Sequence, residues 1–287
     1  MSLFLALLAQ VGPFVTTPAP APDRPAAQRK HGQQEAKPAQ PESPKPSRLQ
    51  ACLDLAASDP GEAVEQAEDW RDQSKGSAQV DAQRCLGAAH SARGEWSEAE
   101  SAFLAGRDAA AANDRLLRAQ LGGMAGNAAL AAGGAERALA ALDAAHADAT
   151  SAENIKLAGE VALDRARALV ALDRNEDAAR ALVEARTSTP DNPLAWLLSA
   201  TLSRRMDRLG EAQAQIATAA QLDPRDPEIG LEAGLIAVLS GHDEAARKSW
   251  QSVVAMAPDG EAGARAKAYL VQLDAPANPP PPAPRRP

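Results

Sequence analysis

The sequence predicts an all-α protein, a solenoid of stacked helical hairpins with a disordered tail at each end. Three observations predict this class. Aromatic residues make up only 3% of the chain, whereas alanine, the best helix former and a poor space filler, makes up about a quarter. The alternation of apolar and polar residues that marks strands is absent. A pattern of small, large and proline residues recurs at a fixed interval along the chain.

Residues 1–15, MSLFLALLAQVGPFV, contain an apolar run of the length found in a signal peptide, although no basic segment precedes it. Gln10, Gly12 and Pro13 end the run too early for a membrane-spanning helix, which needs about 20 apolar residues. We therefore predict a signal peptide over 1–15 and export, periplasmic or otherwise. The alternative is a disordered apolar terminus on a cytoplasmic protein.

Two further segments lack the large apolar groups needed to offset the entropy of ordering. Residues 16–47 are rich in Pro, Ala, Gln and Lys, and predict a disordered, semi-extended tether. Residues 274–287 are also rich in proline, and predict a disordered tail with polyproline II character.

A first, diverged hairpin is predicted from about residue 48, with its turn at Asp59-Pro60-Gly61. Two further diverged copies begin near 80 and 119, so they are spaced more widely than the later repeats, and both lack a closing proline. We expect their second helices to be longer, and Thr150 and Glu153 to form a capping box.

Three segments, 159–192, 193–226 and 227–260, align without a gap. Their eighth and twentieth places hold small residues, the twenty-fourth a large apolar one, the twenty-seventh a small or compact one, and the thirty-second proline. In that order the residues are Ala166, Ala200 and Gly234; Ala178, Ala212 and Ala246; Leu182, Ile216 and Trp250; Ala185, Ala219 and Val253; Pro190, Pro224 and Pro258.

Each repeat therefore predicts two antiparallel helices that cross closely at the small side chains, with the twenty-fourth side chain filling the space between neighbouring hairpins. Proline ends the second helix because it has no amide to donate and clashes with the preceding turn. A helix over 260–273 is predicted to cap the last hairpin. The folded part thus spans 48–273, with five to six hairpins plus a cap.

This pattern resembles the tetratricopeptide repeat (TPR), whose 34-residue period and W-x2-L-G-x2-Y, A-x3-F and P signature it matches at most places. Trp196 occupies the tryptophan place, whereas the tyrosine places hold mainly Ala and Ser. The resemblance covers roughly 48–273. It implies a right-handed α-solenoid whose first helices line a concave groove for extended peptides or helices. The missing tyrosines imply a shallower groove.

On that resemblance, the ninth, twelfth and thirteenth places of the first helices face the groove. They hold the candidate peptide-binding residues Asn127, Arg167, Thr201, Arg204, Arg205 and Leu235. The arginines suit charge-assisted bonds to an acidic segment or a peptide carboxylate. The alternative is that they pair with neighbouring Asp and Glu. The Lys and Asn set with which some TPR proteins hold a C-terminal carboxylate is not reproduced.

The predicted helical body is acidic, with 22 Lys and Arg against 34 Asp and Glu over residues 49–272. Such a body repels phosphate backbones, so nucleic acid is not expected as a partner. No catalytic, cofactor or metal site is predicted, because the sequence lacks phosphate-binding, zinc-protease and nucleophile-elbow motifs. The histidines, His31, His90, His146 and His242, fall in the tether and in three different repeats.

Cys52 and Cys85 are the only cysteines, and their separation in the sequence is close to the length of one repeat. Both fall on predicted first helices, so they should lie on adjacent hairpins. A disulfide is feasible if the protein is exported and the Cα atoms come within about 7 Å. Two buried thiols are the alternative.

The sequence therefore predicts a non-enzymatic TPR scaffold that binds a protein or peptide segment in its groove. A self-associating structural protein of the cell envelope is the alternative. The sequence leaves open the identity of the partner and the oligomeric state.

Overall fold

The computed structural model describes residues 46–275, which form thirteen α-helices and no strand. The predicted signal peptide lies outside the described residues, as do nearly all of the predicted tether and most of the predicted tail. No helix in the described part combines the length and the apolar character needed to span a membrane.

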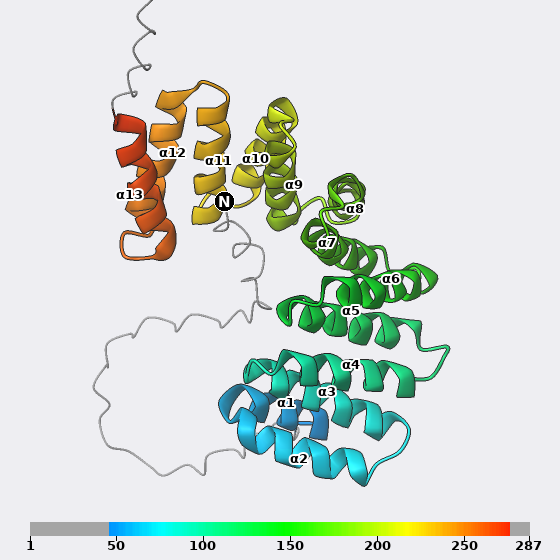
Figure 1. Cartoon of the computed structure of the whole chain (residues 1–287). Helices are drawn as coiled ribbons and strands as arrows, with labels where there is room; N and C mark the ends of the chain where they lie inside the picture. The colour runs from blue at the N-terminus through cyan, green and yellow to red at the C-terminus, as the bar shows by residue number, and fades with distance from the viewer. Residues whose placement is uncertain (1–45, 276–287) are drawn as a thin grey trace, which may run out of the picture.

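The helices follow one another with short connections (Figure 1). Their bounds are α1 (Arg48–Ser58), α2 (Pro60–Asp72), α3 (Ser77–Ala92), α4 (Trp96–Ala109), α5 (Arg115–Ala131), α6 (Ala135–Ser151), α7 (Ile155–Ala171), α8 (Asn175–Ser188), α9 (Pro193–Arg205), α10 (Leu209–Leu222), α11 (Pro227–Leu239), α12 (Asp243–Met256) and α13 (Glu261–Asp274).

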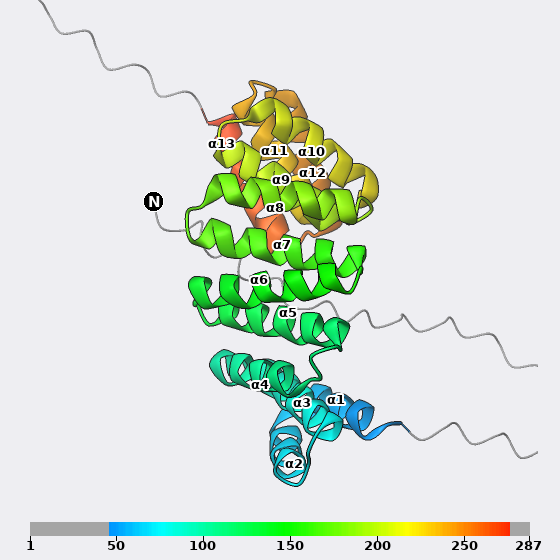
Figure 2. The same ribbon diagram turned by 90° about the vertical axis from the view of Figure 1, so that its right-hand side faces the viewer.

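Consecutive helices pair into six hairpins, from α1/α2 to α11/α12, and α13 packs against α12 as a single end helix. Along the stack, α1 also contacts α3, α5 contacts α7, and α9 contacts α11. The hairpins form an arc with α1 and α2 at one end and α13 at the other (Figure 1). From the side, successive hairpins lie one above another (Figure 2). This arrangement confirms the predicted all-α solenoid.

The five hairpins from α3/α4 to α11/α12 are held by a size match between their two helices. A Cβ atom added to Gly234, at the eighth place, would collide with Nε1 of Trp250, at the twenty-fourth place. The indole therefore occupies the space that a larger residue at 234 would need. The large side chain packs onto the first helix of its own hairpin. The same match pairs Gly87 with Phe103 and Gly126 with Leu142.

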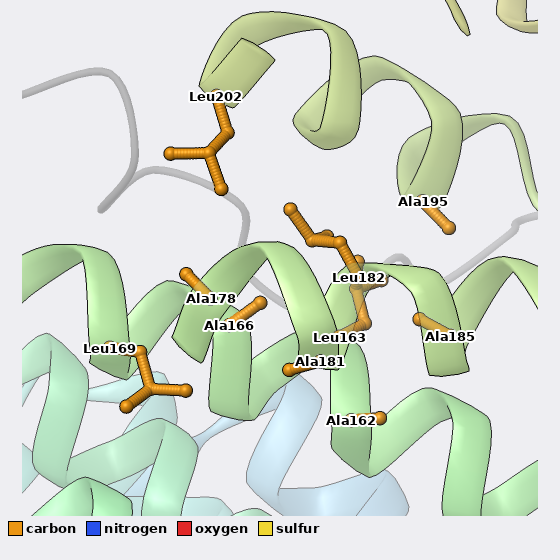
Figure 3. Close-up of a cluster of buried hydrophobic side chains, with 10 residues drawn as sticks. All are labelled: Ala162, Leu163, Ala166, Leu169, Ala178, Ala181, Leu182, Ala185, Ala195 and Leu202. Carbon is orange, nitrogen blue, oxygen red and sulfur yellow. The ribbon is translucent and has the colours of Figure 1, made fainter. Parts of the chain in front are cut away.

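The large side chain also reaches the next hairpin. Leu182 belongs to one buried cluster with Ala166 of its own hairpin and with Ala195 and Leu202 of α9 (Figure 3). Most members of this cluster are alanines, which bring the three helices close together. The residue at the twenty-fourth place therefore fills the space between hairpins, as predicted, and it also packs inside its own hairpin.

In five of the six hairpins, from α3/α4 to α11/α12, the turn depends on one residue with a left-handed backbone, at the fifteenth place of the repeat. Gly94, Gly133 and Gly241 adopt φ values of 74°, 76° and 76°. Asp173 and Asp207 adopt φ values of 55° and 61° at the same place. Glycine adopts this conformation without strain, and Asp is among the residues that tolerate it best.

One local expectation is half right and another is wrong. The second helix α6 is longer, with 17 residues against the 14 of α8, but α4 has only 14, and its extra residues form the turn at 110–114 and the start of α5. Thr150 does not start a helix, because it lies inside α6. Asn154 caps α7 instead, since its side chain accepts a hydrogen bond of 2.9 Å from the amide of Leu157.

A disulfide joins the first two hairpins. Cys52 on α1 and Cys85 on α3 are bonded, with their Cα atoms 6.0 Å apart. Both are buried, in a cluster with Trp70 and Leu86. The bond closes a segment of 33 residues, which restricts the unfolded chain and stabilises the α1/α2 end of the solenoid.

A buried carboxylate joins the second and third hairpins. Asp148 on α6 accepts hydrogen bonds from Arg107 on α4, at 2.8 Å, and from Arg115 on α5, at 2.7 Å. Burial acts to raise the pKa of Asp148, but the bonds from Arg115 and Arg107 and the charge of Arg118 outweigh it, so the pKa lies below its ordinary value. The ionised carboxylate therefore stabilises this junction at neutral pH.

The size match predicts the effect of a single methyl group. Gly234→Ala should lower the free energy of unfolding by about 1–3 kcal/mol, because the added Cβ collides with the indole of Trp250. Gly123→Ala is the matched control, since its Cβ would lie 3.8 Å from Cγ2 of Val161, an ordinary contact. Alanine favours the helix by up to about 1 kcal/mol there, so the control should be as stable as the wild type or more so. Urea unfolding followed by circular dichroism measures both, and unchanged stability of Gly234→Ala would contradict the match.

Candidate functional site

The candidate site lies on the surface formed by the first helices α5, α7, α9 and α11, which we term the first-helix face. In Figure 1, α5 and α7 lie nearer the open side of the arc than their partners α6 and α8. The six predicted binding residues are distributed over this face: Asn127 on α5, Arg167 on α7, Thr201, Arg204 and Arg205 on α9, and Leu235 on α11.

Three of the six line one depression between α7 and α9. Arg167, Thr201 and Arg205 border it together with Val170 and Leu198. Its volume is only about 20 Å³, close to that of one water molecule. The site is therefore a shallow, mostly apolar dish with two arginines on its border, which suits surface contact better than deep insertion.

Asn127 and Arg167 are connected through a residue that the sequence reasoning did not single out. The amide nitrogen Nδ2 of Asn127 donates to Oδ2 of Asp164 at 2.7 Å, and Nη1 of Arg167 donates to Oδ1 of the same carboxylate at 3.2 Å. Burial raises the pKa of Asp164, although Arg167 and Asn127 oppose the shift. Asp164 and Arg167 stand at positions i and i+3 of one helix, and this spacing was the available signal.

Arg204 has a structural role. Its guanidinium holds the carboxylate of Glu232 on α11 at two points, with Nε to Oε1 at 2.6 Å and Nη2 to Oε2 at 3.2 Å. Only 18% of the Arg204 side chain and 9% of the Glu232 side chain are exposed. This two-point pair ties the fifth hairpin to the sixth, so the charge of Arg204 is already neutralised.

Arg205 differs from its neighbour in the chain. It is exposed and forms no hydrogen bond or ion pair with any residue in the 46–275 part of the chain. Leu235 is half-buried and packs against the cluster of Leu231 and Trp250, so it belongs largely to the core of the last hairpin. Arg205 is therefore the predicted arginine whose charge is available to a ligand.

Two of the three histidines in the described part of the chain contact a carboxylate. Nδ1 of His90 lies 2.7 Å from Oε2 of Glu95, and Nε2 of His146 lies 2.5 Å from Oε1 of Glu184. Among the described residues, no group of His, Cys, Asp and Glu side chains is placed to hold a metal ion.

Solved structures with a similar fold exist. BtubC (BKLC) from P. vanneervenii aligns with a TM-score of 0.58 and 14% sequence identity, covering 82% of this chain and 96% of that chain. MamA 41-end from Desulfovibrio magneticus RS-1 aligns with a TM-score of 0.52 and 15% identity, covering 63% of this chain and 97% of that chain. No protein-family model matches the sequence, and no curated protein matches it.

At sequence identities of 14% and 15%, the similarity to these structures is evidence about the fold alone. Together with the three gap-free repeats, each made of two helices with a size-matched crossing, it shows that the chain has the tetratricopeptide-repeat fold.

Two adjacent arginines should respond differently to the same substitution. Arg204→Ala should lower the free energy of unfolding by about 2–4 kcal/mol, because it leaves Glu232 buried without its cation. Arg205→Ala should change it by no more than about 0.5 kcal/mol, because its exposed side chain forms no hydrogen bond or ion pair in the described helical body. Thermal and urea unfolding of the two variants measure this difference, and equal losses would show that Arg205 is also structural.

Proposed function

We propose that this protein is a non-enzymatic TPR scaffold that binds a segment of another protein along its first-helix face. The observation that carries the proposal is the dish between α7 and α9, where three predicted binding residues meet beside apolar side chains. Arg205 supports it further, because an exposed cation without an internal partner is a group that an external carboxylate can engage.

The shape of the dish indicates how the partner is held. A volume of about 20 Å³ is too small for a large side chain, so the partner segment lies across the face. Val170 and Leu198 offer apolar contact, Thr201 offers a hydroxyl, and Arg205 attracts an Asp, a Glu or a chain-terminal carboxylate. We therefore propose an acidic segment as the partner.

A scaffold role is also favoured by what the fold exposes. A solenoid presents long helical faces, whereas catalysis needs polar groups that converge in a pocket. The dish is mostly apolar and shallow, and the half-buried carboxylate of Asp164 on this face is already bonded to Asn127 and Arg167.

We propose that the protein acts outside the cytosol. The disulfide between Cys52 and Cys85 supports this location, because such bonds persist mainly in oxidising compartments. Isolation of the protein from its native compartment with both thiols free would contradict it.

A second candidate function is self-association as a structural unit of the cell envelope. It is favoured by Val271, which is 71% exposed on the end helix α13. A molar mass that rises with concentration in light scattering would favour this function over a monomeric scaffold.

Selection from a random peptide library displayed on phage tests the leading proposal. Peptides enriched on the full chain should carry Asp or Glu, and Arg205→Glu should weaken their binding at least about tenfold through charge reversal. Lys75→Glu is the control, because it makes the same change in charge at an exposed residue in the α2–α3 connection. Equal binding of the selected peptides to the wild type and to Arg205→Glu would remove the first-helix assignment.

A further inference from the structure

A second and larger hollow lies between the fifth and sixth hairpins. It has a volume of about 300 Å³ and is formed by the end of α10, the loop that follows it, α11 and α12. Ile229, Ala233 and Met256 give it an apolar lining, and Asp223 and Asp226 border it at the loop. We term it the α10–α12 cleft. Its volume is at the lower end of that of ligand pockets.

The preceding junction of the solenoid shows what fills this space elsewhere. There, Trp196 occupies the fourth place of its repeat and Arg186 the twenty-eighth place of the repeat before it. The guanidinium carbon of Arg186 lies 4.9 Å from the centroid of the Trp196 ring, a cation–π contact. Nε1 of the indole donates to the carbonyl oxygen of Pro190 at 2.9 Å. The chain thus fills this junction with its own aromatic and basic side chains.

At the α10–α12 cleft the same two places hold residues that are too small to fill the junction. Gly230 stands where Trp196 stands one repeat earlier, and Ala220 stands where Arg186 stands. A Cβ atom at residue 230 would lie 2.5 Å from Cγ2 of Val253, so a side chain at this position would require Val253 to move. The chain therefore supplies no aromatic group from this position.

The loop carries its charges at different places from the preceding loop, although the net charge is the same because Arg225 takes the place of Asp191. The places held by the neutral residues Thr189 and Asn192 in the preceding junction hold Asp223 and Asp226 here. Each of these carboxylates accepts one backbone amide through Oδ1, from Arg225 and from Glu228 respectively. Neither forms an ion pair with a residue of the described chain. The cleft is therefore bordered by two carboxylates that are not neutralised by an ion pair within the described chain.

We propose that the α10–α12 cleft is a docking site for a partner segment that carries an aromatic residue beside an arginine or lysine. The aromatic ring takes the volume that Trp196 fills one repeat earlier, and the cation pairs with Asp223 and Asp226. Lys248 lines the cleft from α12 but pairs with neither carboxylate, so negative charge predominates. The cleft shares no lining residue with the dish between α7 and α9, so this site is independent of the proposed function.

A labelled synthetic peptide, Gly-Ser-Arg-Trp-Ser-Gly, tests the proposal by fluorescence anisotropy on the full chain. Saturable binding is expected, and it should weaken at least about tenfold when Ala replaces Trp or Gln replaces Arg in the peptide. The double variant Asp223→Asn with Asp226→Asn should weaken it to a similar degree, while asparagine preserves the backbone caps. Ala220→Arg, which restores the residue of the preceding repeat, should abolish binding by filling the cleft.

Two controls separate binding in the cleft from binding elsewhere on the chain. Asp191→Asn with Asp259→Asn removes two exposed carboxylates from the neighbouring loops and should leave binding unchanged. Arg205→Glu should also leave it unchanged, and a loss there would place the peptide on the first-helix face and overturn the proposal. Absence of saturable binding, or wild-type affinity in both cleft variants, would overturn it as well. A dimer that Ala220→Arg dissociates would assign the cleft to a second copy of this chain and would likewise overturn it.

Discussion

The structure depends on a match in size, made in the five hairpins from α3/α4 onward, between a small residue on the first helix and a large one on the second. Gly234 and Trp250 show the match at its extreme, since not even a methyl group fits between them. Elsewhere Ala166 and Leu182 make a milder version of the same contact. Because the fit is made inside each hairpin and with the next one, stability grows hairpin by hairpin and no central core is needed. The surfaces of the first helices are thereby left for recognition.

The same constraint explains why the junction between the fourth and fifth hairpins is filled, whereas the junction between the fifth and sixth is open. In the hairpin of α9 and α10, Trp196 packs against a cluster that contains the small Ala219, and the chain fills its own gap. One repeat later, Val253 takes the place of Ala219, and its Cγ2 leaves room only for Gly230. The larger side chain of the pair therefore lies at the junction between hairpins in the first case, as Trp196, and inside the hairpin in the second, as Val253. The α10–α12 cleft is the space that this exchange leaves behind.

The periodic features of this fold could be predicted from the sequence, because they repeat at a fixed interval. The size-matched places and the prolines follow from comparison of one repeat with another, and the turn at Asp59 follows from the local Asp-Pro-Gly signal. Features that depend on single irregular residues could not. The left-handed backbone of Glu153 and the cap at Asn154 set the start of α7, whereas the capping-box spacing indicated Thr150.

The binding residues were harder to predict than the fold, because exposure and pairing depend on side-chain direction. Arg204 and Arg205 are adjacent and look alike in sequence, yet Arg204 holds Glu232 on α11, whereas Arg205 is exposed. A separation of 28 residues carries no signal for such a pair. Asp164 was missed for the same reason, since its bond to Asn127 spans 37 residues.

Recognition through the first-helix face is tested most directly by photo-crosslinking in the source cell from a reactive residue placed on one face of the solenoid. A benzoylphenylalanine at residue 201, on the first-helix face, is compared with one at residue 101, exposed on the second helix α4. We expect a crosslinked protein partner from residue 201 and none of the same mass from residue 101. Crosslinks from residue 101 alone would contradict recognition through this face.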